Sequence, residues 1–169
     1  MNRFKTTELK LIGAFFLVAG LYGLVTFISI VFPFNGLVSL LNLIPTLFFA
    51  LTLYSGYLIL LKEDEKGLEY GRAVIALQIV QFHIMGIGYL FVTGGYIFVG
   101  VTNLNFGINF GLENTFVINL AEETNNFQLR INVLALAIFM YLSKVLKKIE
   151  NEQEALEEIQ KIRKTAHNN

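Results

Sequence analysis

The chain has 169 residues, of which 54% are hydrophobic and only 15% are charged. Soluble globular domains carry about 25% charged residues, so this composition favours a membrane protein. Lys and Arg together number 13, as do Asp and Glu, and this balance argues against a nucleic-acid-binding protein, whose surface carries a basic excess. Cysteine is absent, which excludes disulfide frameworks and thiol chemistry.

Long stretches without Asp, Glu, Lys or Arg predict membrane-spanning helices, because about 20 mostly apolar residues cross the ~30 Å hydrocarbon core. The first stretch follows basic residues directly and lacks the cleavage region of a signal peptide, which indicates a retained anchor. The fourth is long enough only if Lys144 and Lys147 reach out to the interface. The expected spans are residues 10–32, 45–62, 72–94 and 131–148.

Between the first two spans, Leu37, Leu40, Leu41 and Ile44 recur at helical spacing. This pattern is typical of a short amphipathic helix lying in the membrane interface, which we place at residues 36–44. Pro45 would then begin the second span, because proline is tolerated best at a helix start. The alternative is one long tilted helix with a kink at Pro45.

The region between the third and fourth spans changes to a strand-like alternation. Apolar residues at 104, 106, 108 and 110 alternate with Asn and Gly, and the pattern returns at 116–120 and 127–131. The connections at 111–114 and 122–125 are rich in Gly, Asn and Glu, as hairpin loops are. We expect a three-stranded antiparallel β-meander at about 103–132, at or above the lipid headgroups, because open sheet edges do not persist in hydrocarbon.

The predicted fold class is a membrane all-α bundle of four transmembrane helices, with the small β-meander in the external loop between spans three and four. Residues 1–148 form the four-span transmembrane domain, and residues 149–169 form a cytoplasmic amphipathic helical tail. Every Lys and Arg except Arg130 falls on one side of these spans. The positive-inside rule therefore predicts an integral membrane protein with both termini in the cytoplasm.

A candidate intramembrane polar site lies mainly in the third span. His83 is its titratable member, and an ionisable residue at that depth is a candidate functional group, although a neutral histidine can also hydrogen-bond to a neighbouring helix. Gln78 and Gln81 lie on a different face of the same span, where they either hold helices together or line a polar path. Their expected partner on a neighbouring span is Asn42, Thr46 or Asn132.

The sequence offers no support for an enzymatic function. No phosphate-binding glycine loop, nucleophile elbow or metal-ligand spacing occurs, so we expect no catalytic, cofactor-binding or metal-binding residues. The expected function is a non-enzymatic interaction, accessory or sensor role in the membrane. The alternative is a homo-oligomeric channel or transporter with a polar path along span three. The expected partners are the lipid bilayer and a membrane protein or further copies of this chain, without nucleic acid.

Two segments carry a resemblance to known proteins. The chain reads GYLILLK at residues 56–62 and, after a charged loop, LQIVQF at residues 77–82 ahead of a stretch rich in Gly, Tyr and Phe. Over about residues 50–148 it resembles small, uncharacterised four-span bacterial membrane proteins with a strand-rich external loop. The resemblance implies a bacterial inner membrane and implies no activity.

Overall fold

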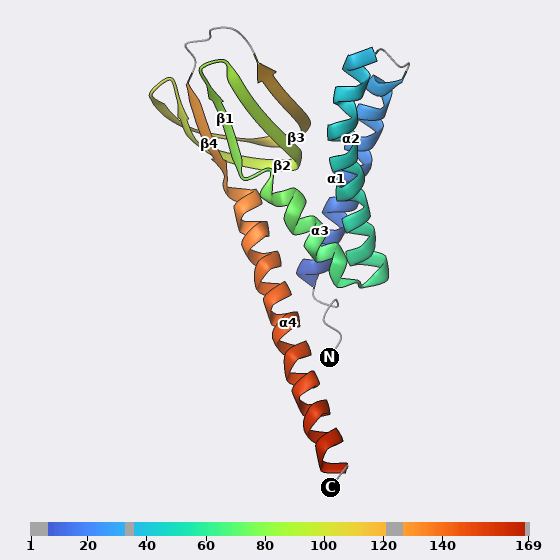
Figure 1. Ribbon diagram of the computed structural model, residues 1–169. Coiled ribbons are helices and arrows are strands. Elements are labelled where there is room, and N and C mark those ends of the chain that lie inside the picture. The colour runs from blue at the N-terminus through green and yellow to red at the C-terminus, as the bar shows by residue number, and fades with distance from the viewer. Residues whose placement is uncertain (1–6, 33–35, 121–126, 168–169) are drawn as a thin grey trace.

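The computed structural model describes residues 7–32, 36–120 and 127–167 (Figure 1). A helical hairpin is formed by α1 (Thr7–Val31) and α2 (Gly36–Tyr57), and a π-helical turn, η2 (Leu58–Lys62), continues α2. The helix α3 (Glu65–Ala76) then leads into the strands β1 (Val80–Ile84), β2 (Ile87–Thr102), β3 (Asn105–Leu120) and β4 (Gln128–Asn132). The long helix α4 (Val133–His167) follows β4 directly.

Glycines allow α1 and α2 to pack closely against each other. A Cβ atom at Gly20 would lie 2.4 Å from the backbone nitrogen of Leu53, and one at Gly56 would lie 2.5 Å from the backbone nitrogen of Leu17. Both distances are too short for any side chain, so the two backbones can approach this far only with glycine at these positions. Small residues at helix contacts are typical of helix pairs in lipid.

Helix α3 turns the chain back across the lower end of the hairpin. The Asp64 side chain caps its N-terminus by accepting a hydrogen bond from the Lys66 backbone N–H at 2.9 Å. Leu68 is fully buried on the inner side of α3, and the Ser55 hydroxyl of α2 donates to the Gly67 carbonyl at 2.7 Å. This bond and the buried apolar side attach α3 to the hairpin.

The four strands form one antiparallel sheet in the order β1-β4-β2-β3. β2 pairs with β3 along its whole length, from Ile87 opposite Leu120 to Thr102 opposite Asn105. On its other edge, β2 pairs with β1 near its start and with β4 near its end, while β1 and β4 also pair with each other. The sheet therefore curls, and in the described part of the chain the outer edge of β3 has no paired strand.

Two tight turns shape this sheet. Met85 and Gly86, between β1 and β2, have φ values of 51° and 83°, and Asn103 and Leu104, between β2 and β3, have 49° and 68°. Two successive residues with positive φ give a turn whose twist matches that of the flanking strands. The Asn103 side chain also accepts a hydrogen bond from the Phe127 N–H at 2.9 Å, which ties the second turn to the start of β4.

Alternation along the strands gives the sheet two chemically different faces. What we call the apolar face is formed, through the register of the four strands, by Phe82, Tyr89, Phe91, Val99, Phe106, Ile108, Phe110, Phe116, Leu129 and Ile131. What we call the polar face carries polar residues on β1, β3 and β4, although β2 contributes buried Val92 and Phe98 to it. Its polar members are Gln81, His83, Thr102, Asn105, Asn109, Asn119, Gln128, Arg130 and Asn132.

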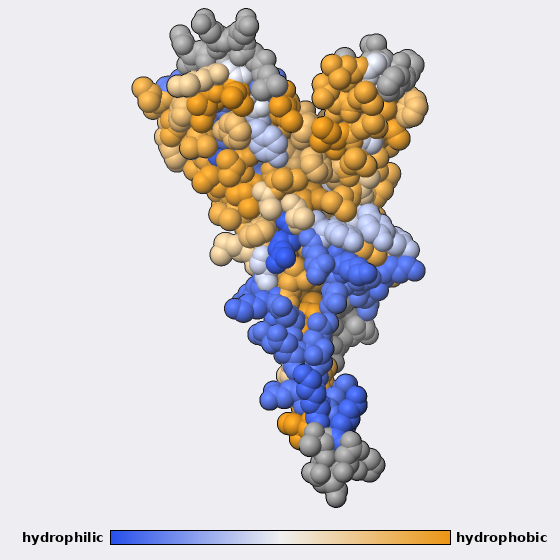
Figure 2. Space-filling model, viewed as in Figure 1, coloured by the Kyte–Doolittle hydropathy of each residue, from blue (hydrophilic) through white to orange (hydrophobic). Residues whose placement is uncertain are grey.

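Aromatic rings join the apolar face of the sheet to the hairpin. Phe91 is buried, and its ring centroid lies 5.4 Å from that of Phe48 and 5.7 Å from that of Phe49. Phe116 of β3 lies 6.1 Å from Phe48. This cluster covers only part of the apolar face, since Phe106, further along β3, is 70% exposed. Figure 2 shows that the outer surfaces of the sheet and of the upper hairpin are both apolar.

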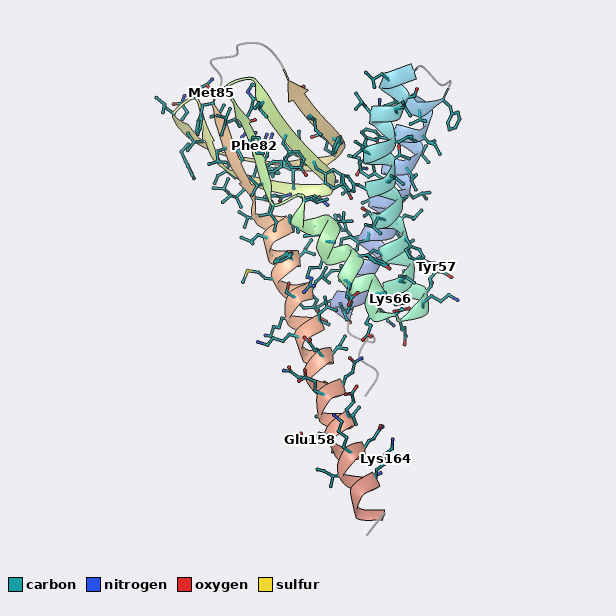
Figure 3. The ribbon with its side chains drawn as sticks, in the orientation of Figure 1. Tyr57, Lys66, Phe82, Met85, Glu158 and Lys164 are labelled. Carbon is teal, nitrogen blue, oxygen red and sulfur yellow. The ribbon has the colours of Figure 1, made fainter. Side chains whose placement is uncertain are left out.

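Helix α4 packs its first half against α1 and α3. Leu142 and Ile149 belong to the same buried cluster as Leu9, Phe16 and Ile75. Beyond this contact α4 continues away from the remaining elements as a strongly charged helix, and Figure 3 shows Glu158 and Lys164 on this extension.

The predicted four-helix transmembrane bundle is wrong. In the described part of the chain two helices, Thr7–Val31 and the segment Ser39–Lys62, are long and apolar enough to cross a membrane. The predicted third span, 72–94, contains the end of α3, β1 and the start of β2. The absence of charges showed only that this segment is hydrophobic. Its apolar side chains alternate with a period of two residues, and the turn at Met85 and Gly86 separates two strands.

The predicted fourth span, 131–148, is also wrong. Its first residues belong to β4, and the rest belong to α4, where charged residues begin at Lys144. The separate interfacial helix at 36–44 is not observed either, because α2 runs without a break from Gly36 through Pro45 to Tyr57. The alternative of one long helix is the observed arrangement. Next to the proline, the Thr46 hydroxyl donates to the Asn42 carbonyl at 2.7 Å.

The predicted three-stranded meander is replaced by a four-stranded sheet. The first two predicted strands are one continuous strand, β3, and residues 111–114 form no turn. The physical reason is that the apolar residues on both sides of 111–114 share even positions, so the alternation crosses this segment without a change of phase. These residues are Phe106, Ile108, Phe110, Leu112, Phe116 and Ile118, and Val117 is the one exception. The predicted loop at 122–125 lies outside the described residues, and the third predicted strand corresponds to β4.

Candidate functional site

The polar face of the sheet holds a group of side chains from three strands, which we call the Arg130 cluster. It consists of Gln81 of β1, Thr102 of β2, and Gln128 and Arg130 of β4. The strand register places Gln81 opposite Arg130, and Thr102 opposite Gln128. Arg130 Nη2 donates to Thr102 Oγ1 at 3.0 Å, so the half-buried guanidinium is held against the sheet.

The amide of Gln128 can face either of its neighbours in the cluster. In one orientation its oxygen accepts from Gln81 Nε2 at 3.3 Å. In the other its oxygen accepts from Arg130 Nη2 at 2.7 Å, Nε at 3.0 Å and Nη1 at 3.2 Å. Hydrogen bonds from a charged donor are the stronger ones, which favours the second orientation. In this second orientation Gln128 no longer accepts a hydrogen bond from Gln81 Nε2.

A shallow cavity of about 210 Å³ opens beside Arg130, between the ends of β2, β3 and β4. Besides Arg130, its polar lining is Thr102, Asn105 and Asn109, and the rest consists of Gly100, Phe106, Gly107 and Ile108. Gly100 is required here, because a Cβ atom would lie 2.1 Å from the Leu129 carbonyl oxygen of the paired strand. The cavity therefore offers a cation, amides and a hydroxyl, a set suited to binding an anionic or polar group.

Two buried amides support the base of the sheet. Gln78 Oε1 accepts from the Thr93 N–H at 2.9 Å. Asn132 Oδ1 accepts from the Ile97 and Ala135 N–H groups, each at 3.2 Å, so it links β2 to the first turn of α4 as a helix cap. Tyr89 donates to the Leu77 carbonyl at 2.8 Å, and burial raises the pKa of Tyr89 to about 12.

The structure separates the four residues of the predicted polar site. Gln81 and His83 lie on β1 and share the polar face, whereas Gln78 lies between α3 and β1 and has the structural contact just described. Asn42 lies on α2, in the helical hairpin. His83 is half-buried and packs over Gly88, where a Cβ atom would lie 2.6 Å from His83 Cδ2.

Sequence reasoning missed three members of the Arg130 cluster: Thr102, Gln128 and Arg130. A signal for two of them was present, because Gln128 and Arg130 alternate with apolar residues and must share one face of a strand. Their meeting with Gln81 was not readable, because it depends on the pairing of β1 with β4 across 47 residues of chain.

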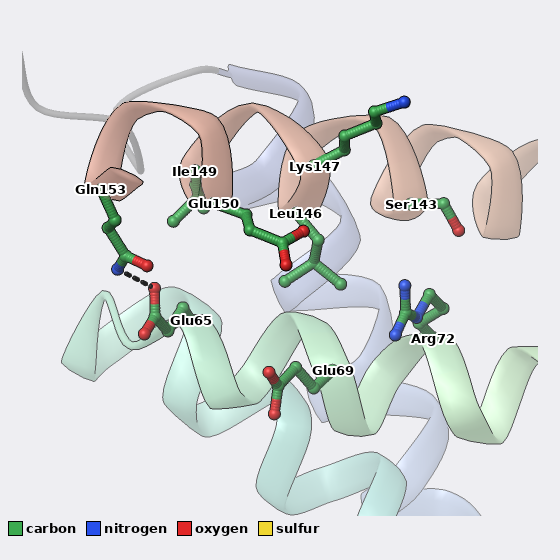
Figure 4. A pocket seen from close by; sticks show the side chains of 9 residues that line it. All are labelled: Glu65, Glu69, Arg72, Ser143, Leu146, Lys147, Ile149, Glu150 and Gln153. Atoms are coloured by element: carbon green, nitrogen blue, oxygen red, sulfur yellow. Dashed lines mark hydrogen bonds between the residues drawn. The ribbon is translucent and has the colours of Figure 1, made fainter. Parts of the chain in front are cut away.

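A second polar site lies between α3 and α4, below the sheet in the view of Figure 1. Figure 4 shows this groove, of about 560 Å³, with acidic and basic side chains from both helices. Gln153 Nε2 donates to Glu65 Oε2 at 3.0 Å and links the two helices across it. The charged residues that line it are Glu65, Glu69, Arg72, Lys147 and Glu150.

No group of three or more His, Asp and Glu side chains that could hold a metal ion occurs within residues 7–32, 36–120 and 127–167. Comparison of the chain with known protein families, with curated proteins and with solved structures finds no match.

Proposed function

We propose that this chain is an integral membrane protein that acts by interaction rather than by catalysis, anchored by the α1–α2 hairpin. The observation that carries the proposal is the outward direction of the apolar side chains of the hairpin. Val18, Val25 and Leu47 are 70%, 60% and 67% exposed. Only 33% and 39% of the most apolar windows of the two helices are buried, whereas a core helix of a soluble protein would be mostly buried.

The length and the charge distribution of the hairpin support membrane insertion. At ~1.5 Å per residue, helices of this length match the ~30 Å hydrocarbon core. The chain has no charged residue from Leu11 to Leu61. Charged residues flank both helices at the same end of the hairpin, with Lys10 on α1 and Lys62 at the end of η2. Lipid would thus cover the apolar surface, and water the charged end.

The position of the other elements supports an orientation. Figure 3 shows Phe82 and Met85 on the sheet beside the upper hairpin, and Lys66, Glu158 and Lys164 towards the opposite end of the molecule. Apart from Arg130, the basic residues in the described part of the chain lie on α3, on α4, at Lys10 near the start of α1 and at Lys62 of η2. By the positive-inside rule we place α3 and α4 on the cytoplasmic side of a bacterial inner membrane.

A second candidate function, an oligomeric channel, is favoured by the chemistry of the sheet. An apolar outer face opposite a polar face that carries Gln81, His83 and Arg130 is the division found in walls of water-filled membrane barrels. Ion or solute flux through liposomes containing the purified chain would support this function. Stable membrane insertion without flux supports the interaction role.

Membrane anchoring is tested by alkaline carbonate extraction and by labelling of single-cysteine variants in intact cells, since the chain has no cysteine of its own. We expect the chain to stay in the membrane pellet. A membrane-impermeant reagent should label Leu37→Cys, in the first turn of α2 at the end of the hairpin away from Lys62, and should leave Lys66→Cys and Glu158→Cys unlabelled until the cells are opened. Release by carbonate, or labelling of Lys66→Cys in intact cells, would contradict the proposal.

A further inference from the structure

Among the described residues no strand pairs with the outer edge of β3, and this edge runs through an uncharged segment. All residues from Asn103 to Phe110 are exposed, and Leu112 is 87% exposed. A Cβ atom built at Gly107 would meet nothing within 4 Å. Natural sheets protect such edges with charges, proline or short strands, and residues 103–112 contain no charge and no proline. Backbone N–H and C=O groups along this edge can therefore accept another strand.

The sequence of this edge is complementary to itself when it runs antiparallel. Residues 105–108 read NFGI and residues 109–112 read NFGL, a four-residue repeat. If Asn109 lies opposite its own copy, Ile108 lies opposite Phe110 and Phe106 lies opposite Leu112 on the apolar face. On the polar face Gly107 lies opposite Gly111, and Asn105 lies opposite Glu113. Apolar side chains then meet apolar ones, glycine meets glycine, and no like charges face each other.

From this complementarity we infer that the β3 edge pairs antiparallel with the β3 edge of a second copy of this chain, about a two-fold axis near Asn109. A two-fold contact uses the same surface on both copies, as this self-complementary segment requires. Pairing joins the two apolar faces into one surface and satisfies the backbone groups of both edges. This inference rests on the proposed interaction function and names the partner as a second copy of the chain. If the sheet lies beside lipid, pairing is favoured further, because unpaired backbone groups are costly there.

The test is disulfide cross-linking of the full chain in native membranes under a mild oxidant. Directly opposite residues of an antiparallel pair have Cα atoms ~4.5–5.5 Å apart, within the range that a disulfide spans. We expect Asn109→Cys to give a covalent dimer of twice the 19.1 kDa chain. Asn119→Cys is the matched control, because Asn119 is also an exposed asparagine on the polar face of β3 and lies outside the paired segment. It should stay monomeric.

A second measurement, the dimer fraction in mild detergent, does not depend on the reactivity of a cysteine. Asn109→Lys places two like charges opposite each other at the axis, and we expect it to lower the dimer fraction in mild detergent at least ten-fold, with Asn119→Lys unchanged. An unaltered dimer fraction in Asn109→Lys, a cross-link of Asn109→Cys only to a different protein, or equal cross-linking of the two cysteine variants would overturn the inference. Carbonate extraction reports on anchoring separately, so a released chain that still cross-links at Asn109→Cys refutes the anchor and retains the β3 pairing.

Discussion

The helical hairpin and the curled sheet present similar apolar outer surfaces, yet their backbone groups find hydrogen-bond partners in opposite ways. Each helix of the hairpin forms its hydrogen bonds within itself, so α1 and α2 need only close packing at residues such as Gly20 and Gly56. The sheet forms its hydrogen bonds between strands, and the outer edge of β3 remains open in the described part of the chain. An apolar helix therefore has its backbone hydrogen bonds formed before it meets lipid, whereas the open edge of an apolar sheet needs a partner strand.

The largest expected effect comes from separating these two regions at their junction. Phe91→Ala removes the buried ring that contacts Phe48 and Phe49, and we expect it to lower the free energy of unfolding by about 3–5 kcal/mol. The measurement is denaturant unfolding of the monomer in detergent micelles. Phe106→Ala on the same face is the control, because its exposed ring should contribute less than about 0.5 kcal/mol. Equal effects of both substitutions would contradict the described junction.

A smaller effect is expected from a substitution that disturbs the packing of the hairpin alone. Gly20→Ala forces a methyl group against the backbone of Leu53, and overpacking of this kind costs about 1–3 kcal/mol. The thermal midpoint of unfolding in micelles should fall accordingly. Gly107→Ala on β3 has open space around the new methyl group and should leave the midpoint unchanged. A tolerated Gly20→Ala would show that α1 and α2 are further apart than described.

The smallest expected effect concerns the contact between the sheet and the start of α4. Asn132→Ala removes the acceptor shared by the Ile97 and Ala135 N–H groups and should cost about 1–2 kcal/mol. Hydrogen exchange should rise at these two amides, because each loses its acceptor. Asn119→Ala, at an exposed position, should change neither stability nor exchange. Unchanged protection of Ile97 and Ala135 in Asn132→Ala would contradict the capping contact.

How far the sequence predicts the structure differs between the two regions. The first span and most of the second correspond to α1 and α2, because a long apolar run has few other stable forms and the hairpin is formed by local contacts. The third predicted span failed at β1 and β2. There, Val80, Phe82 and Ile84 alternate with Gln81 and His83, but a charge-free run of spanning length concealed this period of two.

The candidate site depends still more strongly on tertiary structure. Gln81 and His83 were identifiable as polar residues in an apolar context. Their neighbours Thr102, Gln128 and Arg130 come from two other strands, and the register of β4 against β1 and β2 decides which side chains meet. A shift of one residue in either pairing would place Arg130 on the apolar face.

The sequence by itself determined the apolar character of the chain, the first two of the four predicted helices of spanning length, the strand character of residues 105–120 and 128–132, and the absence of any thiol chemistry. These properties follow from composition and from periods of 3.6 and two residues, which are local. Only the tertiary structure decided that β1 and β2 belong to the same sheet, that this sheet packs beside the hairpin through Phe91, and that in the described part of the chain β3 lies at an open edge. Each of these depends on contacts between residues far apart in the chain, whose pairing no local pattern specifies.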